Sequence, residues 1–198
     1  MLTTFRHLLA PLLLAVGVGA AAAENYAERI APLIDPAKLA TLRERGANPR
    51  VQKYVAHLAE AKKSGVGANN VVIQAVALVG MKGVAAKLTA DAMLRNLTIA
   101  ERLGCLGEAG LRDMRRGQSP TIRNGPYKGD QLSVDHIIPR AVVPELDNVI
   151  ANLELMPSRM NAGKRDKIGA RQLSLAKQLR VAGLLSEKGF KAVKERSP

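Results

Sequence analysis

A turn-rich stretch at residues 119–130, SPTIRNGPYKGD, restricts the fold of this chain most, because it interrupts a long run of helical sequence. Proline, glycine and asparagine at this density favour turns over a continuous helix. Before the stretch, over residues 24–118, apolar residues recur at helical spacing. After it come short β-compatible segments separated by loops. The pattern therefore predicts an α+β protein, mostly helical, with a small β-containing element in residues 119–170 and a C-terminal amphipathic helix in residues 171–198 packed on the same domain.

Proline and glycine positions predict where the helices begin and end. A proline in the first turn and a glycine just past the last turn are typical helix boundaries. Thr89 suits a helix cap because its hydroxyl can accept a backbone N–H. The predicted helices cover residues 36 to about 46, a segment beginning at Asn48-Pro49, a buried helix pair within 71–84, and residues 89–103 and 108–116.

The segment after the turns predicts strand, long loop, strand and helix in that order. Residues 131–135 and 152–156 are short and β-compatible, and two prolines between them, Pro139 and Pro144, favour an extended loop. Pro157-Ser158 predicts the start of a helix. Residues 172–194 form a basic amphipathic helix or helix pair, which glycines break near positions 183 and 189.

The first 23 residues have the composition of a secretory signal peptide. Arg6 lies in a short first segment without acids, an apolar run follows to Ala20, and Ala21-Ala22-Ala23 suits a cleavage site before Glu24. A transmembrane anchor is the alternative, but the run is shorter than the roughly 20 residues that a spanning helix needs, and Pro11 interrupts it. We therefore expect a secreted or periplasmic protein, cleaved after Ala23 and not stably inserted in a membrane.

The charge favours a polyanionic partner. The formal net charge is +13, or +12 once Arg6 is removed with the leader, and the remaining 198 − 23 = 175 residues are enough for one domain with its own core. Such a surplus attracts nucleic acid, anionic lipid or polysaccharide, and charge alone does not choose among them.

The single cysteine and the few aromatic residues exclude several kinds of site. Cys105 has no partner for an intrachain disulfide, and a cysteine-based zinc site is impossible. A lone thiol is usually buried, with an intermolecular bridge as the alternative. A stacking platform for single strands needs several aromatic residues on one surface, so contacts to the nucleic-acid backbone are the expected binding mode.

The sequence LSVDHIIP at residues 132–139 carries the candidate chemistry. His136 suits a general base, because its unperturbed pKa lies close to neutral pH. Asp135 and Asn161 offer oxygen ligands, which favour Mg²⁺ or Mn²⁺ over Zn²⁺. Asn152 is expected to hydrogen-bond the long loop and orient the imidazole. The alternative is that His136 is a core histidine and the asparagines are turn and cap residues.

These residues resemble the HNH endonuclease motif of the ββα-metal superfamily. Asp135-His136-Ile137-Ile138-Pro139 is followed by Asn152 and by Asn161 with Lys164, and the last two asparagines are 161 − 152 = 9 residues apart, as in the motif. The resemblance covers roughly residues 123–167. It implies that His136 is the general base, that Asp135 and Asn161 bind the metal, and that Asn152 is the central structural asparagine.

Two departures from the family pattern qualify this resemblance. Asn161 stands where many members have histidine, which favours a magnesium-type site over a transition-metal site. The zinc-binding cysteine pairs that are frequent in the family are absent, so the small motif must depend on the surrounding helices.

The sequence therefore predicts a metal-dependent endonuclease that hydrolyses phosphodiester bonds of DNA, with RNA left open, and produces 5′-phosphate and 3′-hydroxyl ends. Five cations near the motif are the expected phosphate contacts: Arg140, Lys164, Arg159, Arg123 and Lys128. One rival is a non-catalytic basic protein that binds nucleic acid. The other is a protein held at a membrane surface by residues 172–194.

Overall fold

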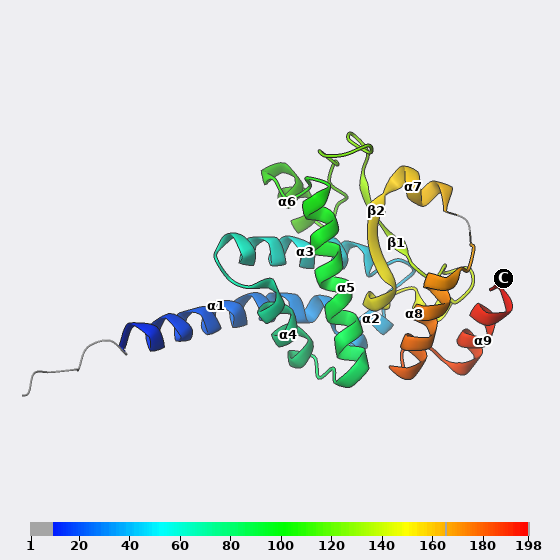
Figure 1. Ribbon diagram of the computed structural model, residues 1–198, viewed down its shortest axis with the longest axis horizontal. Helices are drawn as coiled ribbons and strands as arrows, with labels where there is room; N and C mark the ends of the chain where they lie inside the picture. Colours follow the sequence, from blue (N-terminus) through cyan, green and yellow to red (C-terminus); the bar gives the residue numbers. More distant parts are fainter. Residues whose placement is uncertain (1–9, 165, 198) are drawn as a thin grey trace, which may run out of the picture.

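The chain folds into helices with one two-stranded sheet, as the computed structural model, which describes residues 10–164 and 166–197, shows in Figure 1. This confirms the predicted α+β, mostly helical class. The elements before the sheet are α1 (Ala10–Ile34), α2 (Pro36–Ala40), α3 (Asn48–Lys63), α4 (Ala68–Leu78), α5 (Gly83–Arg102) and α6 (Glu108–Arg115). The remaining elements are β1 (Leu132–His136), the 3₁₀ turns η1 (Pro144–Leu146) and η2 (Ile150–Asn152), β2 (Leu153–Pro157), α7 (Ser158–Gly163), α8 (Ala170–Val181) and α9 (Glu187–Glu195).

Several predicted boundaries are confirmed, three in the helical half are wrong, and a fourth, the break expected at Gly189, is also wrong. The predictions for α3, α6, both strands and the start of α7 agree with the structure to within about a residue. The helix expected to reach residue 46 ends at Ala40. Residues 71–84, expected to form a buried helix pair, contain most of α4, a turn at Gly80 with a φ of 71°, and the first residues of α5. Helix α4 is only partly buried, since its Ile73 and Leu78 are each 53% exposed. Thr89 does not cap a helix; it lies inside α5 and is 2% exposed.

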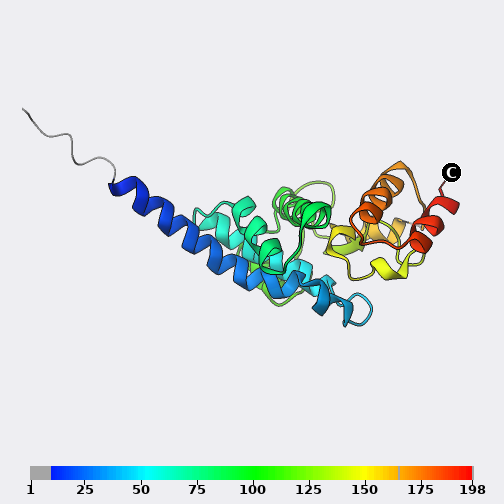
Figure 2. The same ribbon diagram turned by 90° about the horizontal axis from the view of Figure 1, so that it is seen from below.

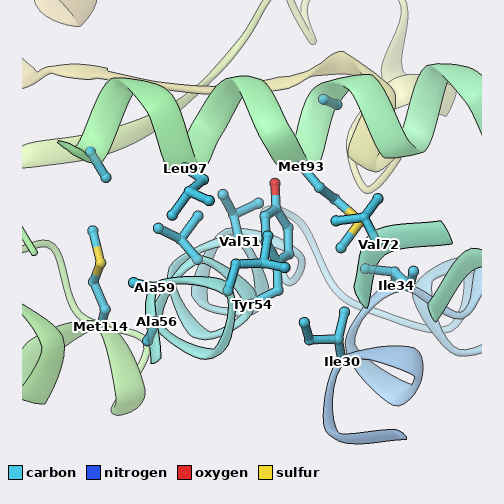
Figure 3. Packing of buried hydrophobic residues seen from close by; sticks show 14 of the residues in the cluster. Ile30, Ile34, Val51, Tyr54, Ala56, Ala59, Val72, Met93, Leu97 and Met114 are labelled. Carbon is cyan, nitrogen blue, oxygen red and sulfur yellow. The ribbon is translucent and has the colours of Figure 1, made fainter. Parts of the chain in front are cut away.

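The helical half packs around α3. Tyr54 on α3 is fully buried among Ile30 of α1, Val72 of α4 and Met93 of α5 (Figure 3). Its hydroxyl accepts a hydrogen bond from Asn96 Nδ2 at 2.7 Å. Burial raises the pKa of Tyr54, so the phenol stays protonated and neutral in the core.

Two buried amide side chains attach the sheet to these helices. Gln52 on α3 donates to the carbonyl of Leu132 in β1 at 2.8 Å. Asn96 on α5 accepts from Leu155 N at 2.8 Å and donates to Leu153 O at 3.1 Å, both in β2. Buried backbone groups need such partners, since an unpaired one costs about 1–3 kcal/mol. The helical half therefore holds both strands in place.

The C-terminal helices pack on the loop between the strands. In the turned view of Figure 2, α8 and α9 lie at one end of the molecule and the helical half lies at the other. Leu179 of α8 and Phe190 of α9 share an apolar cluster with Ile138 and Leu146 of the loop. Gly189 lies inside α9 and does not break it, contrary to the prediction. A Cβ at this position would lie 2.2 Å from Glu145 Oε1, so the close contact between α9 and the loop accounts for a glycine here.

The predicted signal peptide falls partly outside the described residues, which begin at residue 10. Helix α1 runs continuously through the predicted cleavage point between Ala23 and Glu24. Ala23 is 2% exposed and belongs to the first core cluster. In the part of the chain that is described, no helix combines the length and the apolar character that a membrane crossing requires.

Cys105 follows α5 and is 1% exposed. Burial raises the pKa of its thiol to about 11, so the sulfur is neutral at physiological pH. This confirms the expected buried thiol. An intermolecular bridge would need an accessible sulfur.

Candidate functional site

The site is built on the end of β1. This strand pairs antiparallel with β2, and Asp135 lies opposite Glu154 while His136 lies opposite Leu153. Successive side chains of a strand point to opposite faces. Asp135 and Glu154 therefore share one face of the sheet, and His136 begins on the other face, where the strand passes into the loop.

His136 is held by one residue of that loop, Asp147. The imidazole Nε2 lies 2.9 Å from the Asp147 carbonyl oxygen, to which it donates a hydrogen bond. It also lies 2.9 Å from the Asp147 carboxylate oxygen Oδ1, without hydrogen-bond alignment. Both oxygens can only accept, so Nε2 carries the proton of the neutral ring. Nδ1 is then the nitrogen with a free lone pair.

The environment of Nδ1 is compatible with contact to water. Within the described chain this atom has no hydrogen-bond partner, and it is not among the fully buried polar atoms that lack one. The residue as a whole is 8% exposed. His136 is thus a mostly buried ring with one nitrogen fixed and the other available to accept a proton.

Asn152 closes the loop, as expected from the sequence. It is fully buried; its Oδ1 accepts from Ile138 N at 2.8 Å, and its Nδ2 donates to Ile138 O at 3.0 Å and to Leu146 O at 3.4 Å. These bonds join the two arms of the loop. They do not reach the imidazole, so Asn152 can orient His136 only through the loop backbone.

Asp135 lies at an oxygen-lined position that holds a cation. The Lys164 ammonium pairs with Asp135 Oδ2 and also donates to the carbonyl of His136 at 2.6 Å and to that of Ile137 at 3.5 Å. One carboxylate and two carbonyls are hard oxygen donors of the kind that Mg²⁺ and Mn²⁺ prefer. The donors are thus of the type that such an ion takes, and the Lys164 ammonium occupies them in this structure.

Helix α7 places Asn161 near the same face. Asn161 Nδ2 donates to Ser133 Oγ at 3.4 Å, and Ser133 is two residues before Asp135 on β1. The start of α7 is fixed by Asp130, whose Oδ2 accepts from Arg159 N at 2.9 Å. This backbone hydrogen bond lowers the pKa of Asp130, which stays ionised at the positive end of the helix.

Glu154 balances the charge beside Asp135. It is 7% exposed and pairs with Arg95 of α5, whose Nε lies 3.2 Å from Glu154 Oε1, and with Arg171 of α8. The hydrogen bond to Glu154 raises the pKa of Arg171. Two carboxylates side by side on a sheet would repel each other. The two arginines and Lys164 compensate that repulsion.

The five predicted phosphate contacts lie in different environments. Arg140 forms an ion pair with Glu44 at 2.5 Å. Arg159 Nε lies 3.5 Å from Asp130 Oδ2, and Lys164 forms an ion pair with Asp135. Arg123 and Lys128 are exposed and have no ion pair within the described residues. The structure thus brings Lys164 to the candidate site and leaves Arg123 and Lys128 on the turn-rich stretch that precedes β1.

Four residues around this site were not predicted from the sequence: Asp147, Glu154, Arg95 and Arg171. Asp147 had one visible signal, since it and Glu145 are the only acids between His136 and Asn152. A hollow of about 440 Å³ between α2 and the loop is lined by Asp147 and Arg140 but not by Asp135 or Asn161. It lies next to the support of His136 and is separate from the cation position.

No family model, curated protein or solved structure matches the chain. Nor do the described residues contain a group of three or more histidine, cysteine, aspartate or glutamate side chains able to hold a metal. A metal ion at Asp135 would therefore also need neutral oxygens, which the Asn161 amide, backbone carbonyls and water could supply.

Proposed function

We propose that the chain is a metal-dependent endonuclease of the HNH type, with residues 119–170 as its ββα-metal motif. The observation that carries the proposal is the pairing of two unlike groups at one strand end. His136 has a fixed tautomer with Nδ1 available, and Asp135 next to it lines a group of oxygens that bind the Lys164 ammonium. The order β1, loop, β2, α7 supports the same conclusion.

The proposed reaction is hydrolysis of a phosphodiester, with His136 as the general base. Nδ1 takes a proton from water as the water oxygen forms a bond to phosphorus. The bond from phosphorus to the 3′-oxygen breaks, and that oxygen gains a proton from solvent. The products are a 5′-phosphate and a 3′-hydroxyl. A positioned base of this kind contributes roughly 10²–10⁴-fold in rate.

Asp135 and Asn161 are the residues proposed to hold Mg²⁺ or Mn²⁺. When bound, such an ion supplies positive charge that offsets the negative charge of the phosphate and the leaving oxygen. Lys164 must leave the Asp135 carboxylate for this, and its long side chain can then turn to a phosphate oxygen. Asn152 keeps the loop closed and so keeps His136 at the end of β1.

The proposed setting is outside the cytoplasm, with nucleic acid as partner. The signal-like residues 1–23 support export, and the net charge of +13 supports binding to DNA, with RNA left open. Arg123, Lys128, Arg140, Arg159 and Lys164 are the proposed phosphate contacts.

The function is tested by incubating the purified protein with supercoiled plasmid, single-stranded DNA and RNA, each with Mg²⁺, Mn²⁺ or EDTA. We expect cleavage of DNA with either metal and none with EDTA. End-labelling should detect 5′-phosphates. Tight DNA binding without cleavage under any of these conditions would instead favour the non-catalytic rival.

Salt should weaken DNA binding steeply. Each phosphate contact contributes about −0.9 to the slope of log affinity against log salt concentration. The exposed Arg123 and Lys128 alone predict a slope of about −2, and all five cations about −4 to −5. Fluorescence anisotropy in EDTA at several salt concentrations measures this slope.

The matched variants separate these contributions. Replacing both Arg123 and Lys128 by alanine should reduce the slope by about 2. Lys191→Ala, on the exposed side of α9, should leave it unchanged. A flat salt response in the unmodified protein would contradict binding through phosphate contacts.

The membrane-surface rival has less support from the structure. Phe190, the only aromatic residue in 172–194, is 8% exposed and packs on the loop with Leu179 and Val193. An interfacial helix needs its apolar face free to enter the lipid. Here the larger part of that face is inside the protein, although Val181 is 71% exposed.

A further inference from the structure

Asp147 is the loop residue that contacts the reactive histidine, and nothing in the sequence pattern assigned it a role. We propose that Asp147 is the positioning residue of His136: it fixes the ring in the tautomer with the proton on Nε2, and so leaves Nδ1 as the base. The inference rests on the proposed function for its catalytic consequence. The geometry that supports it is independent of any substrate.

The position of the Asp147 carboxylate favours a proton on Nε2 of His136. Asp147 is 8% exposed, and its Oδ1 is buried without an aligned hydrogen bond from any described residue. Nε2 of His136 is the donor at 2.9 Å that can satisfy it, by sharing one proton between Oδ1 and the Asp147 carbonyl. A buried acceptor that stays unsatisfied is costly, so this arrangement favours a proton on Nε2 over a proton on Nδ1.

The helical half holds Asp147 in turn. The second carboxylate oxygen, Oδ2, accepts from Arg45 N at 2.9 Å, across more than 100 residues of sequence. The next residue, Asn148, accepts from Ala47 N at 2.9 Å and donates to Arg43 O at 3.2 Å. Arg45 has a φ of 56°, a left-handed conformation that a non-glycine residue adopts only when its surroundings impose it.

These contacts connect the helical half of the protein to the imidazole of His136. The turn at residues 41–47 holds Asp147 and Asn148, Asp147 holds Nε2, and Asn152 closes the loop that contains both. Asp147 also stabilises the ring after proton transfer, because its negative charge lies beside the imidazolium that forms. Its role is to orient and stabilise His136; it does not touch the phosphate.

The test uses Asp147→Asn, which keeps the backbone carbonyl as an acceptor for Nε2–H but replaces the carboxylate by an amide. If the amide oxygen of that Asn accepts from Arg45 N, its Nδ2 faces the ring and can donate only to an unprotonated Nε2. Long-range ¹H–¹⁵N NMR of the metal-free protein without DNA reads the tautomer directly, and the chain has only three histidines to assign. We expect the Nε2–H form in the unmodified protein and a measurable share of the Nδ1–H form in Asp147→Asn. The kcat for plasmid cleavage should fall roughly 10- to 100-fold with KM unchanged, as when a residue that orients a functional histidine is lost.

Glu145→Gln is the matched control, because it removes one negative charge from the same loop two residues earlier. Its amide oxygen can still accept from Ser186. The control should keep the tautomer, kcat and melting temperature of the unmodified protein. An equal fall of kcat in both variants would overturn the proposal, since the loss would then be structural or purely electrostatic.

Three further results would test the role of Asp147. An Nδ1–H ring in the unmodified protein overturns the proposal whether or not the variant folds. If Asp147→Asn changes the tautomer of His136 but not kcat, or lowers kcat without changing the tautomer, the tautomer does not determine the rate and the proposal is overturned. If the unmodified protein cuts no nucleic acid with Mg²⁺ or Mn²⁺, the proposed function fails, while the NMR result still tests the positioning of His136.

Discussion

Replacing His136 by alanine should lower the rate of plasmid cleavage roughly 10²–10⁴-fold, the loss typical of a general base. His136 lies at the end of β1 with Nε2 held by Asp147, so that Nδ1 is the ring nitrogen able to take a proton from water. Alanine removes that acceptor but leaves Asp135 and Asn161 in place. DNA binding in EDTA should therefore persist at nearly its original affinity.

The controls separate loss of the base from loss of the fold. His57→Gln changes a histidine of α3 that lies 3.6 Å from Glu60 and outside the site, and it should leave the rate unchanged. His136→Gln keeps a polar side chain near Asp147 and should be as inactive as alanine if proton transfer is what was lost. Cleavage at the original rate by either His136 variant would show that another group, or no group, acts as the base.

Replacing Asp135 by alanine should abolish the metal-dependent activity, a loss of about 10³-fold or more. The neutralisation of phosphate charge by a metal contributes several kcal/mol, and about 1.4 kcal/mol corresponds to tenfold in rate. Asp135 is the only carboxylate among the oxygens around the Lys164 ammonium in the described structure. EDTA should reproduce the effect in the unmodified protein.

Metal binding can be measured apart from cleavage. Titration of Mn²⁺, followed by electron paramagnetic resonance, should show a site that Asp135→Asn loses. Asp91→Asn, which removes an exposed acid of α5 paired with Lys87, should keep that site. Cleavage that is indifferent to EDTA, or an Asp135 variant with normal activity, would remove the metal from the mechanism.

Local signals predicted the elements that hold the site. The prolines and glycines around α3, α6 and α7 act through the backbone within a few residues, so their effect is visible in the sequence. Both strands were predicted because β-compatible residues follow a turn-rich stretch that ends the helical pattern. The early end of α2 was not predictable in this way, since residues 41–47 bond to Asp147 and Asn148, about 100 positions later.

The contacts around the candidate residues were harder to predict than the helix boundaries, because they join segments that are far apart in the sequence. The sequence indicated that Asn152 would close the loop, and its bonds to Ile138 agree. It did not indicate Asp147, because that residue acts on His136 partly through a backbone carbonyl, which any residue type carries. Thr89 shows the opposite error, since a hydroxyl suited to capping can equally be buried inside a helix.

The amide side chains that attach the hairpin to the helices also close it to other chains. A two-stranded sheet normally leaves N–H and C=O groups exposed along its outer edges, where a third strand can add. Asn96 occupies Leu153 O and Leu155 N on the outer edge of β2, and Gln52 occupies Leu132 O on β1. At these positions each amide side chain makes the hydrogen bond that the backbone of a neighbouring strand would otherwise make. At the start of β1 the turn-rich stretch adds to this, since Leu132 N donates to Pro120 O at 2.9 Å and Thr121 bridges Gln131. These positions on the outer edges of the hairpin are therefore already bonded within the chain, and a strand of another molecule would have to displace those bonds to pair there.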